Sequence, residues 1–214
     1  MLIYIIRHGE TDANLEGRLQ GWNNNPLNES GIRLAKIVGQ NMKDIKFDKC
    51  ISSPLIRAKD TARLLLEESG NDIPIETDER IKEISMGEWE DRDFVSLKEE
   101  VGEEGLKPFF EDPFDFPGCP GGETIKTVCE RTQEFLKELI KKDDDKTYLI
   151  ATHGCALRAM LNFLYDDPTD FWHGHVPYNC VVNVVEAKDG VGKIIADDKL
   201  FYDPKDAVDR YSDV

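Results

Sequence analysis

Apolar positions follow two different periods along this chain, and the periods predict alternating strands and helices. The short apolar run Leu2–Ile6 is typical of a strand that is buried on both faces. After Asn28, which can cap a helix, apolar residues recur at helical spacing to about Lys43. The same two patterns predict further strands at Cys50–Ile51, Ile73–Ile75 and Thr147–Ala151. They predict further helices from Ser53-Pro54 to Gly70, from Thr124 to Ile140 and from Ala156 to Leu164. The strands Cys180–Ala187 and Val191–Asp198 are expected to form a hairpin that turns at Asp189-Gly190.

This order of elements predicts an α/β fold. Strands that alternate with helices form a mostly parallel sheet between helical layers, here a three-layer α/β/α sandwich, and the terminal hairpin adds an antiparallel edge. We expect a single domain over residues 1–214. Residues 91–122 break the pattern with five phenylalanines, four prolines and many acids, and we interpret them as a lid-like insertion over the active site.

The charge balance narrows the choice of partners. The chain has 43 acidic and 27 basic residues, which gives a net charge of −16. Nucleic acids and anionic membranes attract clusters of Lys and Arg, so we expect neither as a partner. The longest apolar run, Met1 to Ile6, is too short to span a membrane, and no basic segment precedes it. The five cysteines are scattered without a CxxC pair, which favours reduced thiols and a cytoplasmic protein.

Polar residues follow three of the predicted strands directly. They are Arg7 and His8 after the first strand, Ser53 and Arg57 after the second, and His153 and Gly154 after Thr147–Ala151. Because ligands bind at the carboxyl ends of strands in such folds, we expect these groups to converge. Two histidines and two arginines around one point form an anion-binding site, as phosphoryl transfer requires.

Several of these residues also have plainer interpretations. Arg57 could lie on a helix surface and pair with Asp60 or Asp48. His173 and His175 have a spacing that a metal could use, but no carboxylate or cysteine is obviously placed with them, so we interpret them as polar residues at the pocket rim. We therefore expect neither a metal nor a cofactor.

Short motifs recur in order from residue 1 to about residue 190. They are Arg7-His8-Gly9-Glu10-Thr11 with Asn14; Gly21-Trp22 with Pro26-Leu27 and Gly31; Ser53-Pro54 with Arg57-Ala58 and Thr61-Ala62; Ile81, Glu83, Gly87, Trp89 and Glu90; and Thr152-His153-Gly154. Together they resemble the histidine phosphatase superfamily, which includes the cofactor-dependent phosphoglycerate mutases and small broad-specificity phosphatases. The chain is most similar to the small phosphatases.

The resemblance implies a role for each matched residue. His8 would be the nucleophile and become a phosphohistidine, while Arg7, Arg57 and His153 would hold the phosphoryl oxygens. Glu83 would protonate the leaving oxygen and then activate water. Asn14, the Gln20–Gly21 turn and Gly154 would add contacts to the phosphate. The residues alone leave Glu83 open as a solvated acid among Asp78, Glu79 and Glu88, and Cys155 is expected to be a buried, inert thiol.

The chain departs from the mutase pattern after Glu83. The mutases carry an Arg-His-Tyr-Gly stretch there and later a paired arginine, whereas this chain has Ile84-Ser85-Met86-Gly87 and no arginine pair in its insertion. A phosphoglycerate carboxylate would lack its usual partner, which favours a phosphomonoesterase acting on small phosphorylated metabolites. A phosphoglycerate mutase and a non-catalytic phosphate-binding relative are the alternatives, the latter weakened because nucleophile and acid are both present. Asp91 stands where the family often has glycine.

The insertion leaves two possibilities for substrate choice. Its phenylalanines could line the pocket mouth, with its acids repelling a second anionic group on the substrate. These acids are Glu99, Glu100, Glu103, Glu104, Glu111, Asp112 and Asp115. Alternatively, the phenylalanines pack the insertion onto the sheet while the acids face water. The first possibility predicts monophosphates with an apolar or flat, uncharged body.

Overall fold

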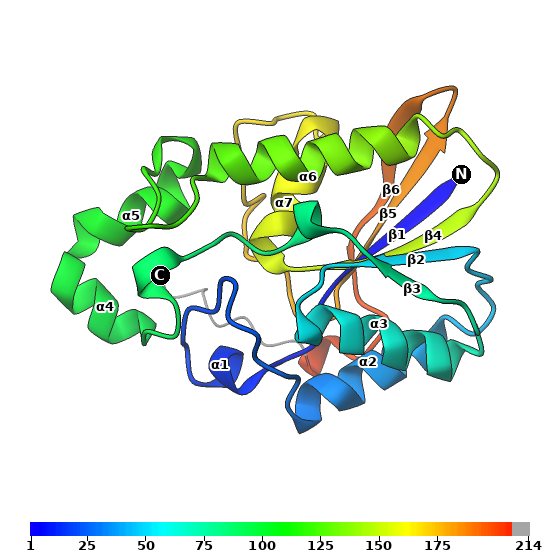
Figure 1. Ribbon diagram of the computed structural model, residues 1–214, viewed down its shortest axis with the longest axis horizontal. Helices are drawn as coiled ribbons and strands as arrows, with labels where there is room; N and C mark the ends of the chain where they lie inside the picture. Colours follow the sequence, from blue (N-terminus) through cyan, green and yellow to red (C-terminus); the bar gives the residue numbers. More distant parts are fainter. Residues whose placement is uncertain (207–214) are drawn as a thin grey trace.

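A mixed sheet forms the middle layer of the molecule (Figure 1). The computed structural model describes residues 1–206, with the backbone alone at 103 and 104, so residues 207–214 of the expected domain lie outside it. The described strands are β1 (Leu2–Arg7), β2 (Lys49–Ser52), β3 (Ile75–Thr77), β4 (Thr147–Thr152), β5 (Val182–Lys188) and β6 (Val191–Lys199), in the order β3-β2-β4-β1-β5-β6. Strands β1 to β4 are parallel, and β5 is antiparallel to both β1 and β6. The predicted mostly parallel sheet with an antiparallel edge hairpin is confirmed.

Helices cover both faces of this sheet (Figure 1). They are α2 (Glu29–Asn41) and α3 (Ile56–Ser69) on one face, and α6 (Ile125–Ile140) and α7 (Gly154–Leu161) on the other. Each pair buries its apolar stripe against the sheet, which gives one apolar cluster on either side of the strands. The expected caps hold, because Asn28 accepts a hydrogen bond from the Gly31 amide and Thr124 accepts one from the Thr127 amide.

The start of α3 differs from the prediction. The helix begins at Ile56 behind Leu55, which cannot cap it, and the Ile56 amide donates to Asn24 Oδ1 at 2.7 Å instead. Ser53 was the expected cap, but its hydroxyl lies 2.7 Å from a ring nitrogen of His153. The same hydroxyl accepts from the Leu55 amide at 3.3 Å, so it holds the turn that precedes the helix. The other differences are small: β3 begins at Ile75, and α7 ends at Leu161 before a short 3-10 turn.

The insertion is helical. It contains α4 (Phe94–Val101) and α5 (Glu103–Glu111), which Figure 1 shows beyond the end of the sheet that lies opposite the start of β1. Their apolar residues form a third cluster with α7 and with Trp172, separate from the two clusters on the sheet. None of the helices between residues 1 and 206 combines the length and apolar character that crossing a membrane would need.

The register of the sheet places three chain segments at one edge. Arg7 pairs with Thr152, and Ser52 pairs with Ala151, so β1, β4 and β2 end at the same level. The residues that follow these ends are brought together, as expected for the carboxyl edge of a parallel sheet.

Candidate active site

His8 follows β1 and is buried at this edge. Its Nδ1 lies 2.7 Å from the carbonyl oxygen of Gly9. A carbonyl oxygen can only accept, so Nδ1 carries the proton and Nε2 keeps its lone pair. Burial lowers the pKa of His8 well below its ordinary value, and the nearby positive charges of Arg57 and Arg7 lower it further. The imidazole is therefore neutral at pH 7, as a nucleophile must be.

The backbone around His8 is fixed from two sides. The Gly9 amide donates to Thr61 Oγ1 at 2.9 Å, and the Thr61 hydroxyl donates to the Arg57 carbonyl at 2.7 Å. Asn179 Nδ2 donates to the His8 carbonyl at 3.0 Å. Sequence reasoning missed the part played by Asn179, which lies in a loop far along the chain with no motif around it. A Cβ on Gly9 would lie 2.7 Å from the carbonyl oxygen of Gly31, so the loop packs too tightly against α2 for a side chain there.

Two buried arginines flank His8. Arg57 is fully buried in the first turn of α3 and donates to the carbonyl oxygens of Gly21 and Asn23, both at 2.7 Å. It pairs with neither Asp60 nor Asp48, so it is not a helix-surface residue. Burial lowers the pKa of Arg57 to about 10, which leaves it charged at pH 7. Arg7 Nη1 donates to the carbonyl oxygen of Pro177.

His153 lies behind His8, not in the wall of the cavity described below. Its ring centroid is 5.2 Å from that of His8, and it is fully buried. Burial lowers its pKa well below the ordinary value, with Arg57 as the next cause. Gly154, the residue after it, does line the cavity. The predicted contact of His153 with phosphoryl oxygens remains a prediction.

Glu83 lies at the N-terminus of α7 and lines the cavity. Its Oε1 accepts from the amides of Ala156 and Ile84, each at 3.0 Å, and Oε2 accepts from the Cys155 amide at 3.4 Å. These bonds fix the carboxyl group at the wall of the cavity, so Glu83 is not simply a solvated acid. Burial raises the pKa of the Cys155 thiol well above its ordinary value, as expected of an inert thiol.

The segment that carries Glu83 is held by a residue that sequence reasoning did not find. Arg131 of α6 donates to the carbonyl oxygens of Arg80 at 2.8 Å, Lys82 at 2.7 Å and Glu83 at 2.9 Å. Its guanidinium also pairs with Glu123 at 2.8 Å. One side chain thus fixes three carbonyls next to the carboxyl group. Helical spacing gave no signal for this, because an arginine on a half-exposed helix face usually faces water.

The remaining predicted contacts line the same cavity. Asn14 and Gln20 are buried, and both have side-chain oxygens close to the Thr11 hydroxyl, at 3.1 and 2.9 Å. Gly21 has a φ of +51°, and a Cβ there would lie 2.4 Å from a carboxylate oxygen of Glu90. Asn14, Gln20 and Gly21 thus form part of the cavity wall.

His173 and His175 lie elsewhere. Neither lines this cavity; His175 Nε2 lies 3.2 Å from a carboxylate oxygen of Asp198, and the centroid of the His173 ring lies 3.7 Å from that of Tyr165. Arg158, fully buried, joins the same cluster through Asp198. Their neighbours Trp172 and Val176 do line the cavity, so the interpretation of both histidines as rim residues stays a prediction. No group of three or more His, Cys, Asp and Glu side chains in residues 1–206 is arranged to hold a metal ion.

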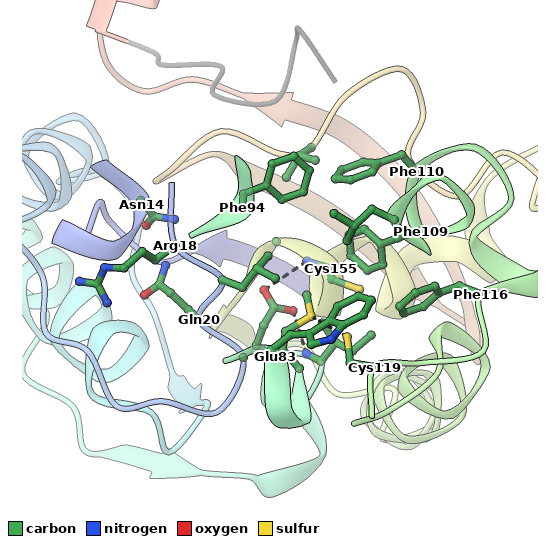
Figure 2. A pocket seen from close by; sticks show the side chains of 18 of the residues that line it. Asn14, Arg18, Gln20, Glu83, Phe94, Phe109, Phe110, Phe116, Cys119 and Cys155 are labelled. Carbon is green, nitrogen blue, oxygen red and sulfur yellow. Dashed lines mark hydrogen bonds between the residues drawn. The ribbon is translucent and has the colours of Figure 1, made fainter. Parts of the chain in front are cut away.

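The cavity has a polar end and an apolar end (Figure 2). Four of the five insertion phenylalanines, Phe94, Phe109, Phe110 and Phe116, line it. The same four rings also belong to the apolar cluster of the insertion, either buried in it or packed against it. The fifth, Phe114, packs on Phe171 with ring centroids 5.7 Å apart. Four of the phenylalanines therefore line the cavity, as the first possibility predicts, and they also pack within the insertion's own cluster and not onto the sheet. The described acids of the insertion stay outside the cavity wall.

The chain is similar to known proteins in sequence and in fold. A probable phosphoglycerate mutase, GpmB, from Salmonella choleraesuis is 32% identical over 166 residues, which cover 78% of this chain and 75% of that protein. The solved structure of Bacillus stearothermophilus YhfR superimposes with a TM-score of 0.86 at 28% identity and covers 94% of this chain and 99% of its own. A mutant phosphoserine phosphatase from Entamoeba histolytica in complex with phosphoserine has a TM-score of 0.76 at 30% identity, with 93% and 97% covered.

The family match spans almost the whole described chain. Residues 3–196 match the histidine phosphatase superfamily, branch 1. This range contains all of the predicted site residues and every strand except the first residue of β1 and the last three residues of β6. The chain therefore belongs to branch 1 of the histidine phosphatase superfamily.

Proposed function

We propose that this protein is a phosphomonoesterase that hydrolyses small phosphorylated metabolites through a phosphohistidine on His8. The observation that carries the proposal is the tautomer of His8. Its proton is held on Nδ1 by Gly9, so the lone pair of Nε2 is available in a cavity that Arg7, Arg57 and Glu83 also line. A nucleophile, two cations and a carboxyl group in one cavity are the parts that phosphoryl transfer through a covalent intermediate requires.

The reaction has two steps. Nε2 of His8 attacks phosphorus, the bond from phosphorus to the ester oxygen breaks, and Glu83 gives its proton to the leaving oxygen. Water then attacks the phosphohistidine, Glu83 takes a proton from it, and the P–N bond breaks to return the lone pair to Nε2. Arg7 and Arg57 balance the charge of the phosphoryl oxygens in both steps. Among the described residues, Arg57 Nε and His153 Nδ1 are buried without a hydrogen-bond partner, and phosphoryl oxygens near either would supply acceptors to an N–H there.

A mutase is the second candidate, because one relative at 32% identity is a probable phosphoglycerate mutase. A mutase would use the same phosphohistidine but return the phosphoryl group to the substrate. The cavity argues against it. Beyond Arg7 and Arg57, its one other described cation is Arg18, which pairs with Glu16 at 2.7 Å and with Asp91. A substrate carboxylate would compete with both acids.

The test compares the wild type with His8→Ala and, as a control outside the cavity, His173→Asn. Phosphate release is measured over a panel of phosphomonoesters. In a second assay the enzyme is mixed with radiolabelled substrate, the reaction is quenched during turnover, and the protein is tested for acid-labile label on a histidine. We expect turnover and label in the wild type and in His173→Asn, and neither in His8→Ala. Turnover by His8→Ala would overturn the mechanism. Faster interconversion of phosphoglycerates than hydrolysis would establish the mutase instead.

A further inference from the structure

The half of the cavity away from His8 is apolar. Its wall there consists of Leu19, Ile84, Met86, Trp89, Phe94, Leu106, Phe109, Phe110, Phe116, Cys119, Trp172 and Val176. The space inside the whole cavity, including the part open to solvent, is about 740 Å³. Twelve apolar residues line the cavity beside its polar groups, so the wall offers more surface than a phosphoryl group alone would contact. A substrate body can therefore lie against this wall.

The rings of the aromatic wall hold one another in place. The ring of Phe109 has its centroid 5.3 Å from those of both Trp172 and Phe116, in edge-on contacts. Trp172 Nε1 donates to the Phe109 carbonyl at 2.9 Å, which fixes the indole to α5. Phe110 stacks on Trp172 at 6.3 Å and meets Phe94 edge-on at 5.8 Å. Rings fixed in this way lose little conformational freedom when a ligand packs on them.

The same wall offers no charge to a substrate. The thiol of Cys119 has its pKa raised to about 12 by burial, so it stays neutral and contacts the sulfur of Met86 at 3.6 Å. Two acids of the insertion are paired outside the cavity, Glu100 with Arg92 and Glu111 with Lys107. A charged group on the substrate body would lose its water here without gaining a partner, which is unfavourable.

Glu83 fixes the direction in which a substrate lies. Figure 2 shows its carboxyl group between the polar side, with Asn14 and Gln20, and the aromatic side, with Phe109 and Phe116. A phosphoryl group at His8 places the leaving oxygen toward Glu83, so the rest of the alcohol continues toward the rings. We propose that the preferred substrates are monophosphate esters of alcohols that carry an aromatic or bulky apolar body and no second charged group. This inference rests on the proposed phosphatase function.

The test uses substrates with matched leaving groups, so that chemistry does not obscure binding. Propyl phosphate and 3-phenylpropyl phosphate are both esters of primary alcohols and differ in the phenyl group. Burial of that group predicts a kcat/KM about tenfold to a hundredfold higher for the phenylpropyl ester. Phosphoserine and 3-phosphoglycerate, which carry charged bodies, should rank below it. The inhibition constants of the corresponding propyl and phenylpropyl phosphonates should differ in the same direction.

A pair of variants ties the preference to the wall. Phe110→Arg puts a cation at the edge of the apolar end, where Phe110 is only partly buried, whereas Val95→Arg puts the same cation on the exposed face of α4 outside the cavity. Phe110→Arg should lose most of the phenylpropyl advantage and gain activity on 3-phosphoglycerate. Val95→Arg should keep the wild-type ranking.

The outcomes separate this inference from the proposed function. Hydrolysis in which phosphoserine, 3-phosphoglycerate or propyl phosphate equals the phenylpropyl ester overturns the substrate class and leaves the phosphatase intact. Absence of hydrolysis of every ester overturns the proposed function, and the phosphonate comparison then still decides whether the apolar end binds. If Phe110→Arg does not fold, the order of kcat/KM values that the wild type shows for these esters decides the substrate class by itself.

Discussion

His8 and His153 are two imidazoles buried next to two guanidinium groups. The pKa of each is lowered, first by burial and then by Arg57. One consequence is chemical, because His8, the proposed nucleophile, needs no deprotonation at neutral pH. A second consequence concerns the free energy of unfolding, because at low pH the unfolded chain binds protons at these histidines and the folded chain does not.

The first prediction is that both histidines stay neutral below their ordinary pKa. Their ring carbon NMR signals should keep neutral shifts from pH 7.5 down to about pH 5.5 in the free protein. Since the folded pKa values are depressed, neither histidine affects stability above the unfolded pKa of about 6.5. Below it the unfolded state binds protons, so each histidine lowers the free energy of unfolding by about 1 kcal/mol between pH 6.5 and 5.5. Titration of both rings near pH 6.5 would contradict this.

The second prediction concerns Glu83. Glu83→Gln should lower kcat/KM for alkyl phosphates by about 10²-fold to 10⁴-fold, since an alkoxide leaves poorly without a proton. For 4-nitrophenyl phosphate, whose leaving group needs no proton, kcat/KM should fall much less, and phosphoenzyme should accumulate because water lacks its base. The exposed neighbour in Glu88→Gln is the control and should behave as wild type. Equal losses on both substrates would remove Glu83 from the role of acid.

Single residues also show what a sequence can and cannot reveal. Asp91 stands where the resemblance leads one to expect glycine, and its φ of +66° gives the physical reason for that preference. Its amide donates to the Leu19 carbonyl at 2.6 Å, and its carboxylate pairs with Arg18. These contacts offset the cost of about 1 kcal/mol or more for a left-handed conformation. A sequence gives no φ, so this explanation needed the structure.

At the scale of elements, prediction succeeded where burial follows a simple period. The apolar run of β1 and the helical stripe of α6 face the core along their whole length, so their patterns are visible in the sequence. The helices α4 and α5 were missed because their apolar residues pack into a separate cluster and also line the cavity. Pro108 inside α5 hid the helix further. The positions of residues that line a cavity depend on the shape of the cavity, so their spacing along the sequence need not match a helical period.

Element packing also explains why the position of Glu83 depends on α6. Arg131 crosses from this helix to the carbonyls of the segment 80–83 and is itself held by Glu123. No bond from Arg131 reaches the carboxyl group, so it is a positioning residue. The spacing of apolar residues along α6 identifies its buried face, but it does not show which groups an arginine at the border of that face will contact.

The third prediction follows from this contact. Arg131→Met keeps the apolar stem but removes all donors to the three carbonyls, so the carboxyl group should lose its fixed position. We expect kcat on an alkyl phosphate to fall about 10-fold to 100-fold with KM little changed, because misplacement of a proton donor affects the chemical step. Lys126→Met, on an exposed part of the same helix, is the matched control. A loss confined to thermal stability, with kcat unchanged in the folded fraction, would make Arg131 purely structural.

At the scale of the whole molecule, the net negative charge of the chain repels an anionic substrate, while the arginines of the cavity attract it. The chain carries −16, yet the cavity wall contains Arg7, Arg18 and Arg57. The negative field extends over a Debye length of about 30 Å at 10 mM salt and about 8 Å at 150 mM. The two arginines beside His8 act at contact distance in a buried site, where salt screens much less.

The last prediction is that salt helps this enzyme. A phosphate dianion approaching a chain of net charge −16 is repelled at long range, so raising ionic strength from 10 to 150 mM should increase kcat/KM severalfold. The rise should lie in KM or in the association rate, since the chemical step occurs inside the buried site. A doubly phosphorylated substrate should show a steeper rise than a monophosphate, because the repulsion grows with its charge. A steady fall of kcat/KM with salt would mean that the arginines of the cavity, and not the net charge, govern the approach of the substrate.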